Sequence, residues 1–303
     1  MKKKHLILTT LIYLLFNACS SEQLVENNQE NNEYNTNGQL LEAVIDEVNF
    51  FEVFLYDNEN KPLARILNIP IRHYPESYNN LFNQRLLTKN IHYYVYNNSN
   101  KVVETRAFFG GLFFFENNRV YSINESTNEI LDITDIRTRY ELIKHTYDNN
   151  NRVNSLSSFL NNGNPNVYLE YKYNNQEQIK SLYINYISNG SEESFTEYTY
   201  FDREIKITSV NFDGDFNEVY VTHNNVLNPY NKLFVDFGIG TTFGISSSIG
   251  KSFYPAFTIP IKYFFGSKNE VQEINDFNYP KKTLHKSLPT PRVNYTELTY
   301  TYR

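Results

Sequence analysis

The 303-residue sequence has no tryptophan, one cysteine and one methionine, with only 11 glycines and 10 prolines. A single cysteine excludes a disulfide-stabilised scaffold. So few glycines and prolines exclude a collagen-like chain or a low-complexity linker protein. Beyond the N-terminus, no run of about 18 apolar residues occurs, so the sequence predicts no transmembrane helix there.

Positive charge is also in short supply. The chain has 28 Lys and Arg against 34 Asp and Glu, for a net charge of −6. Removing the first 18 residues removes three lysines and leaves 25 basic against 34 acidic side chains. Binding to a phosphate backbone needs a basic surface. We therefore expect no nucleic-acid partner.

Aromatic residues and asparagine are what the sequence has in abundance. There are 26 Tyr, 23 Phe and 44 Asn, and aromatics make up 16% of the chain. This aromatic content can build a packed core, which excludes a mainly disordered chain. AT-rich coding sequence favours Asn, Lys, Ile, Tyr and Phe, and we expect it to explain part of the bias.

The N-terminus has the features of a secretory signal peptide. Three lysines at positions 2–4 precede a broken apolar run at 6–16, which is too short to span a bilayer. The sequence Leu-Phe-Asn-Ala-Cys at 15–19 resembles a bacterial lipobox. This resemblance implies a lipoprotein signal peptide over 1–18 and lipidation of Cys19. An ordinary cleaved signal with a leftover cysteine is the weaker alternative.

Residues 19–40 are polar, acidic and poor in apolar side chains, which predicts a disordered, flexible tether. Ser20, Ser21 and Glu22 follow Cys19 without the Asp that retains lipoproteins in the inner membrane. They resemble the Ser/acidic export signals of Bacteroidota lipoproteins. We expect a lipid-anchored protein of the outer membrane. The periplasmic and the cell-surface face stay open.

The body of the chain alternates aromatic-rich runs with Asn-rich turns. The runs contain Tyr, Phe, Val and Ile, which favour strands, and several alternate with period two. Asn and Asp tolerate the positive φ of tight turns, so a glycine-poor chain can still form hairpins. Runs before turns lie at 48–56, 91–96, 112–115, 140–147, 167–173 and 195–200, and returning strands at 153–159, 179–187 and 205–212.

The clearest turns follow Tyr147, Tyr173 and Tyr200, at spacings of 26 and 27 residues. The sequence at 147–153, Tyr-Asp-Asn-Asn-Asn-Arg-Val, resembles the Tyr-Asp (YD) repeat of Rhs-type proteins, with Asn151 in place of the usual Gly. The layout is similar to uncharacterised Bacteroidota lipoproteins. The resemblance implies an all-β fold, an antiparallel meander of hairpin repeats forming a curved sheet or partial barrel, and no known activity. Without an internal linker, 41–303 is expected to be one domain.

Two segments depart from this pattern. Residues 233–250 are apolar and punctuated by glycine, which fits a capping loop, a short apolar helix or a membrane-contacting hairpin. We favour the loop, folded over the open end of the sheet. Residues 280–291 lie between prolines and predict a second non-strand connection. Residues 293–302 alternate and predict a closing strand.

Motifs for catalysis or metal binding are missing or incomplete. No Gly-x-Ser-x-Gly elbow, dinucleotide fingerprint or clustered histidine set occurs. Asp213 and Gly214 begin like a calcium loop but fit a hairpin turn better. Glu170 and Glu197 occupy matching repeat positions, either as a glycosidase pair or as charges on the solvent face, which we favour. We predict no catalytic residue, metal or cofactor and assign no ligand-binding residue.

Three functional hypotheses remain. The first is a membrane-anchored, non-enzymatic binding or assembly module for an outer-membrane protein or a glycan, with exposed tyrosines as contact surface. The alternative is an envelope polysaccharide-active enzyme. The third is a purely structural repeat protein. The sequence favours the first.

Overall fold

The computed structural model describes residues 40–46, 51–67, 87–202, 204–211, 213–239, 258–260, 268–287 and 294–302. The predicted signal peptide, the tether and Cys19 lie outside these residues. Residues Leu40–Arg303 cluster as one unit of contacts. Within the described part of the chain, α2 (Pro229–Phe237) is the one α-helix, and η3 (Arg137–Arg139) and η4 (Ile187–Asn189) are short 3-10 turns.

All other regular structure is β-strand. Before η3 the strands are β1 (Leu41–Asp46), β2 (Phe51–Tyr56), β3 (Pro62–Leu67), β4 (Thr88–Tyr96), β5 (Val102–Glu116), β6 (Arg119–Ile123) and β7 (Ile130–Asp132). Up to α2 they are β8 (Glu141–Tyr147), β9 (Val153–Phe159), β10 (Pro165–Tyr173), β11 (Ile179–Tyr186), β12 (Glu192–Tyr200), β13 (Glu204–Val210) and β14 (Phe216–Leu227). The last are β15 (Thr258–Pro260), β16 (Lys268–Ile274), β17 (Pro280–Ser287) and β18 (Asn294–Tyr302).

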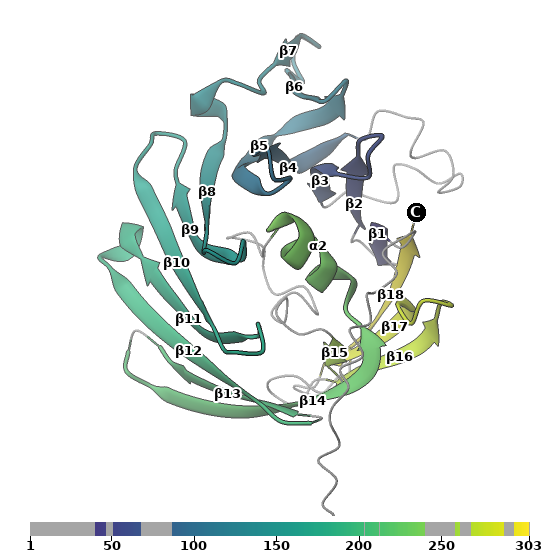
Figure 1. Cartoon of the computed structure of the whole chain (residues 1–303). Helices are drawn as coiled ribbons and strands as arrows, with labels where there is room; N and C mark the ends of the chain where they lie inside the picture. The colour runs from purple at the N-terminus through teal and green to yellow at the C-terminus, as the bar shows by residue number, and fades with distance from the viewer. Residues whose placement is uncertain are drawn as a thin grey trace, which may run out of the picture. The chain divides into compact units, whose positions relative to one another are not determined.

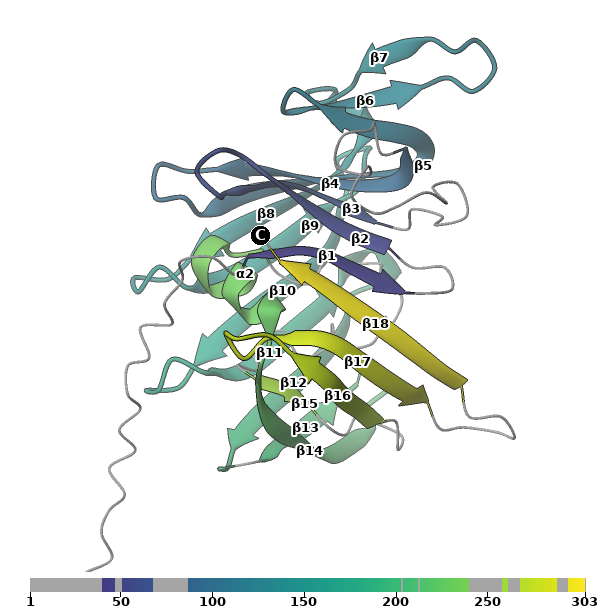
Figure 2. The same cartoon turned by 90° about the vertical axis from the view of Figure 1, so that its right-hand side faces the viewer.

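The strands form an antiparallel meander. Consecutive strands pair with each other from β1 to β7, from β8 to β15 and from β16 to β18. The first half of β5 also pairs with β8, and its second half carries β6 and β7. The last strand, β18, pairs with β1, so the two ends of the body lie side by side (Figure 2). Among the described residues no ladder joins β14 to β16, and the curved sheet is not closed into a barrel. The predicted all-β hairpin meander is confirmed.

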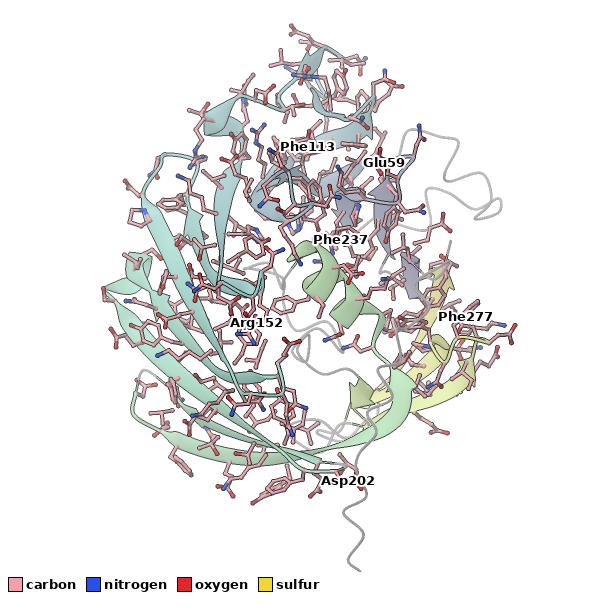
Figure 3. The ribbon with its side chains drawn as sticks, in the orientation of Figure 1. Glu59, Phe113, Arg152, Asp202, Phe237 and Phe277 are labelled. Atoms are coloured by element: carbon pink, nitrogen blue, oxygen red, sulfur yellow. The ribbon has the colours of Figure 1, made fainter. Side chains whose placement is uncertain are left out.

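A single type of turn recurs between the strands, at 57–61, 97–101, 148–152, 174–178 and 275–279. In the third of these, Asp148 Oδ1 accepts hydrogen bonds from the N–H groups of Asn150 (2.9 Å) and Arg152 (3.0 Å). The fourth turn residue has a left-handed backbone, as Asn151 does with φ 64°. The equivalent residues are Asn60, Asn100, Glu177 and Asn278. Four of the five are Asn, so asparagine does here what glycine usually does. Glu59, Arg152 and Phe277 mark three of these turns in Figure 3.

A tyrosine at the end of a strand ties each hairpin to its neighbour. The Tyr147 hydroxyl donates to the carbonyl of Val102 (2.6 Å), the first residue of β5. We call such bonds tyrosine clamps. The other clamps are Tyr56 to Leu41, Tyr96 to Pro62, Tyr173 to Val153, Tyr200 to Ile179 and Tyr302 to Pro280. Burial raises the pKa of the Tyr147 hydroxyl above its usual value, so it stays protonated as a donor.

Helix α2 lies in the hollow of the curved sheet (Figure 1). It begins after Asn228, whose side chain accepts from the N–H of Tyr230 (3.1 Å), and it ends at Gly238, with φ 76°. Asn at the N-cap and Gly at the end of a helix are the residues expected there. A Cβ on Gly238 would lie 2.1 Å from the Tyr147 hydroxyl, so only glycine fits beside this clamp.

The main core fills the space between α2 and the sheet. The rings of Phe234 and Tyr171 pack with centroids 5.7 Å apart, and those of Phe237 and Tyr96 pack at 6.4 Å. Phe237 lies at the end of α2 in Figure 3. The same cluster includes buried residues from β1, β2, β4 and β8–β11. All clamp tyrosines except Tyr200 pack against it, and Tyr200 packs against a small separate cluster of residues from β13 and β14.

A second core lies beneath a fold-over of β5. Val53, Ala64 and Ile66 of β2 and β3 pack with Phe113 and Val120 from the second half of β5 and from β6. Figure 2 shows β5 turning away from β4 to carry β6 and β7. β2 and β3, which lie under this part of β5 and β6, are therefore buried on both faces. Apart from Glu52 and Arg65 their buried residues are apolar rather than alternating with polar ones.

A charged network is buried under α2. Arg65 Nε donates to Glu52 Oε1, and the Tyr230 hydroxyl donates to Glu52 Oε2 (2.9 Å). The side chains of Glu52 and Arg65 are each 1% exposed. The Arg65 guanidinium also lies 5.6 Å from the ring centre of Phe54. The network joins β2 and β3 to the helix. Inside the core the positive charge of Arg65 is paired with the negative charge of Glu52.

Two predictions about the departing segments were wrong in part. Residues 233–237 belong to α2 rather than to a loop, because Asn228 and Gly238 cap a helix whose apolar side faces the core. The rest of the 233–250 segment, from 240 onward, lies outside the described residues. Residues 280–287 form β17 rather than a connection. Pro280 takes the first strand position, where its missing N–H is tolerated. The closing strand at the C-terminus is confirmed, and it pairs with β17 and β1.

The tyrosine clamps should contribute to stability. Tyr147→Phe removes one buried hydroxyl donor and is expected to lower the free energy of unfolding by about 1 kcal/mol. Denaturant unfolding followed by circular dichroism measures this change. Tyr121→Phe is the matched control, because its ring stacks on Phe114 at 5.0 Å and its hydroxyl bonds to no residue in the described ranges. Equal stability for the two variants would contradict the clamp.

The buried charge network should be intolerant of losing one partner. Arg65→Met removes the guanidinium that pairs with the buried Glu52 carboxylate, and it is expected to cost roughly 3–5 kcal/mol of unfolding free energy. The double variant Glu52→Gln/Arg65→Met removes both charges and should cost clearly less. The surface pair Lys206–Glu218 (2.6 Å) supplies the control Glu218→Gln, expected to cost less than about 1 kcal/mol. A single variant no worse than this control would refute the role of the network.

Candidate functional site

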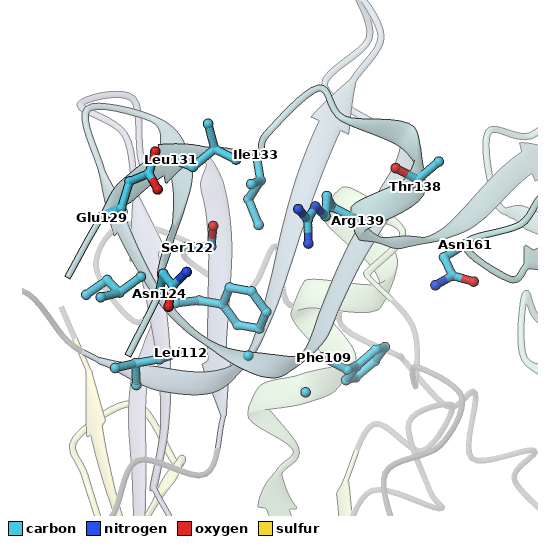
Figure 4. Close-up of a pocket in the computed structure, with 14 residues that line it drawn as sticks. Phe109, Leu112, Ser122, Asn124, Glu129, Leu131, Ile133, Thr138, Arg139 and Asn161 are labelled. Atoms are coloured by element: carbon cyan, nitrogen blue, oxygen red, sulfur yellow. The ribbon is translucent and has the colours of Figure 1, made fainter. Parts of the chain in front are cut away.

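A pocket of about 460 Å³ opens where β5 bends. Its floor is the bend itself, and its walls come from β6, the region around β7, η3 and the turn between β9 and β10. Figure 4 shows Glu129 and Arg139 on opposite walls, with Phe109 below them. The lining residues are Phe109, Gly110, Gly111, Leu112, Phe113, Ser122, Ile123, Asn124, Glu129, Leu131, Ile133, Thr138, Arg139 and Asn161.

Two glycines make the bend. Gly110 has φ +76°, a backbone conformation that residues with a side chain rarely adopt. A Cβ on Gly111 would lie 2.8 Å from the ring of Phe113, so that ring covers bare backbone. In the ladder with β4, Phe109 pairs with Asn90 and Phe113 pairs with Thr88, which makes this part of β5 bulge out. Bulges of this kind bend a strand and redirect its side chains, and they are frequent next to functional sites.

The floor presents one exposed aromatic ring. Phe109 is 40% exposed, although the buried His92 of β4 contacts it edge-on at 5.8 Å between ring centres. Phe113 is only 5% exposed and packs against Phe108 in the second core. One ring therefore anchors the bend, and the other offers a face to a ligand.

Ion pairs and hydrogen bonds fix three of the four arginines around the pocket. Arg106 donates to Asp135 (2.6 Å), and Arg119 donates to the other oxygen of the same carboxylate (2.9 Å). The hydrogen bond from Arg106 holds the pKa of Asp135 below its usual value. Arg137 donates to the carbonyls of Tyr140 (2.7 Å) and Leu160 (2.8 Å), which joins η3 to the β9–β10 turn. These bonds set the walls of the pocket.

Arg139, the fourth arginine, lines the pocket itself. Its guanidinium makes no hydrogen bond or ion pair with the part of the chain that the structure describes. The side chains of Ser122, Glu129 and Asn161 are likewise without a partner among the described residues. The pocket thus combines donors and acceptors that are open to a ligand with one positive and one negative charge.

The paired carboxylates singled out in the sequence are not part of this pocket. Glu170 forms an ion pair with Lys172 (3.5 Å) and accepts from the Tyr168 hydroxyl (3.3 Å). Glu197 is exposed on β12, and the two carboxylates lie on strands that flank β11. This arrangement fits charges on the solvent face. Cys19 lies outside the described residues.

Two histidines are buried in the sheet and one acidic motif forms a turn. His92 contacts Phe109, as described above, and the Nε2 of His145 lies 3.0 Å from Thr105 Oγ1. The Asp213 and Gly214 motif is a hairpin turn, as predicted: Gly214 has φ 81° and its N–H donates to Asn211 O (2.8 Å). In the described ranges, no three His, Cys, Asp or Glu side chains are grouped to hold a metal ion.

The described helices include none that is long and apolar enough to cross a membrane.

Comparisons with known proteins give no family. No protein-family model matches the sequence, and no curated protein matches it. Among solved structures, the chain is similar to a porin-like protein from Bacteroides uniformis, with TM-score 0.44 and 11% identity over 87% of this chain and 96% of that one. A porin-like protein from Bacteroides vulgatus has TM-score 0.32 and 8% identity over 88% and 99% of the two chains. A TcdB2–TccC3–Cdc42 structure has TM-score 0.24 and 8% identity, with coverage of 59% and 11%. Similarities this low carry no functional assignment.

Sequence reasoning missed the pocket because its floor and walls come from five separate segments. One local signal was present. Gly110 and Gly111 interrupt an aromatic-rich run in a chain that has only 11 glycines. Glycine inside a strand pattern indicates a bulge or a close approach of backbone. Nothing in the local sequence distinguishes Arg139 from Arg106, Arg119 and Arg137, whose side chains are paired in the structure.

The burial of His145 predicts a pH dependence of stability. Burial lowers its pKa from 6.5 to about 4, so the folded protein holds it neutral. In the unfolded chain His145 is protonated as the pH falls below 6.5, whereas in the folded chain it is protonated only below about pH 4. Between about pH 7.5 and 5, this histidine should cost the protein roughly 2 kcal/mol of unfolding free energy. Urea unfolding at both pH values measures the loss, and His145→Gln should remove most of it. An unchanged pH dependence in that variant would contradict this assignment.

Proposed function

We propose that the protein is a lipoprotein of the bacterial cell envelope, anchored to the outer membrane through a lipid on Cys19. The observation that carries this proposal is the sequence at 15–19, which follows a basic and then a short apolar segment. Several acyl chains on one cysteine hold a protein on a membrane, since each buried methylene contributes about 0.8 kcal/mol.

For the body we propose a non-enzymatic binding or assembly module for a protein partner or a glycan. The pocket beside the β5 bend supports binding, because it exposes an aromatic ring and polar groups without partners. Hydrolysis of a polysaccharide is the alternative. It needs two carboxylates flanking the scissile bond, and Glu129 is the one carboxylate among the described lining residues.

Replacing the cysteine tests the anchor. The full chain is expressed in a bacterial host with lipoprotein processing, fed an alkyne-labelled palmitate, and separated into membrane and soluble fractions. We expect label and membrane recovery for the wild type, and neither for Cys19→Ser. Ser21→Ala, two positions away, is the control and should behave as wild type. A wild-type protein that is unlabelled and soluble would refute the anchor.

Isolation of the full-length protein from its native envelope tests the role of the body. A tagged chain is extracted in mild detergent, and mass spectrometry identifies what accompanies it. Stoichiometric recovery of an outer-membrane protein would support an assembly module. Recovery of the protein alone would support a free-standing binder, and turnover of a polysaccharide by the pure protein would overturn the non-enzymatic proposal.

A further inference from the structure

We propose that the pocket beside the β5 bend binds a segment of a neutral glycan. This inference rests on the proposed binding function and names the ligand class for that pocket. It depends on three features: an aromatic floor, a set of polar side chains without partners, and balanced charge. None of these features depends on the anchor at Cys19.

The floor fits the apolar face of a sugar ring. The face of an aromatic ring carries partial negative charge, which attracts the partly positive C–H groups that line one side of a pyranose. Phe109 is 40% exposed, and its position is set by the edge-on contact with buried His92 at 5.8 Å. The bare backbone at Gly110, where a Cβ would meet nothing within 4 Å, lets a flat ring approach the bend closely.

The walls fit the hydroxyl groups. Each sugar hydroxyl can donate one hydrogen bond and accept others, so a sugar needs donors and acceptors together. Arg139 donates only, Glu129 accepts only, and Ser122 and Asn161 do both. All four line the pocket without a partner among the described residues. Hydrogen bonds to the two charged groups would be the stronger ones.

The charge and size of the pocket are compatible with a neutral oligosaccharide. The lining contains one cation and one carboxylate, on opposite walls, so an anionic ligand would meet repulsion from Glu129 (Figure 4). The volume of about 460 Å³ falls within the range of roughly 300–1,000 Å³ typical of small-molecule sites. Leu131, Arg139 and Asn161 of the lining are exposed to solvent.

Ligand-detected NMR on the full-length protein in mild detergent tests the proposal. The probes are short oligosaccharides of glucose, mannose, galactose and xylose, with oligogalacturonates and dipeptides as charged alternatives. We expect saturation transfer to at least one neutral series and none to the charged probes. Titration of that series then gives the affinity.

Variants locate the binding. Phe109→Ala and Arg139→Ala should each weaken affinity by roughly tenfold or more, through loss of stacking and of a charge-assisted hydrogen bond. Phe201→Ala and Lys180→Ala are matched controls, since both residues are exposed and lie outside the pocket. They should change affinity by less than about twofold. Asn161→Ala changes a side chain in an exposed turn and should weaken binding by roughly threefold. Unlike Phe109→Ala, it leaves the contact between Phe109 and His92 intact, so its effect does not depend on a change in the floor.

The outcomes separate this inference from the proposed function. No neutral oligosaccharide binding, or binding that the pocket variants do not weaken, would overturn the glycan assignment. Pocket-dependent binding of the uronates or the dipeptides would also overturn it, in favour of a charged ligand. In each of these cases, labelling at Cys19 and recovery of an envelope partner would still stand as separate results for the proposed function.

Discussion

The tyrosine hydroxyl at the end of a strand fixes the register between one hairpin and the next. In a sheet, a slip of one residue moves every side chain to the opposite face. The clamp from Tyr147 to Val102 forms only when both strand ends are level, and the same holds for Tyr173 and Tyr200 with their acceptors. Because each acceptor is the first residue after the preceding turn, correct turns and correct register depend on each other. The side chains that pack against α2 therefore depend on this alignment to face the core.

The regular pattern breaks at two places, and each break has a structural use. After β14 the chain leaves the meander to form α2, which fills the hollow and meets the buried charges of Glu52 and Arg65. At Gly110 and Gly111 the chain leaves the plane of the sheet and carries β6 and β7 over the other face. Sites where a sequence breaks its own local rules are often functional ones. The pocket lies at the second break.

The local parts of the fold could be predicted from the sequence. Strands and turns depend on neighbouring residues, so the aromatic runs and the polar turns after Tyr147, Tyr173 and Tyr200 identified the hairpins. For helix α2 a short apolar helix was one of three alternatives, but the loop was preferred, because the capping roles of Asn228 and Gly238 were not recognised. Strand β17 was missed because Pro280 suggested a break. In this fold proline opens strands: Pro62 and Pro280 both begin one, and their carbonyls accept clamps. The pocket required contacts between distant segments, which no local pattern contains.

The bonds that shape the pocket also explain why its remaining polar groups suit a ligand. Asp135 holds Arg106 and Arg119, and Arg137 holds the β9–β10 turn through the carbonyl of Leu160. The walls are therefore set before a ligand arrives, so binding would order few additional groups. Arg139 follows Arg137 by two residues on the same short turn, yet its charge stays unpaired among the described residues. Three arginines in this region are thus fixed by the fold, and the exposed Arg139 is the one whose guanidinium can still change partners at the pocket.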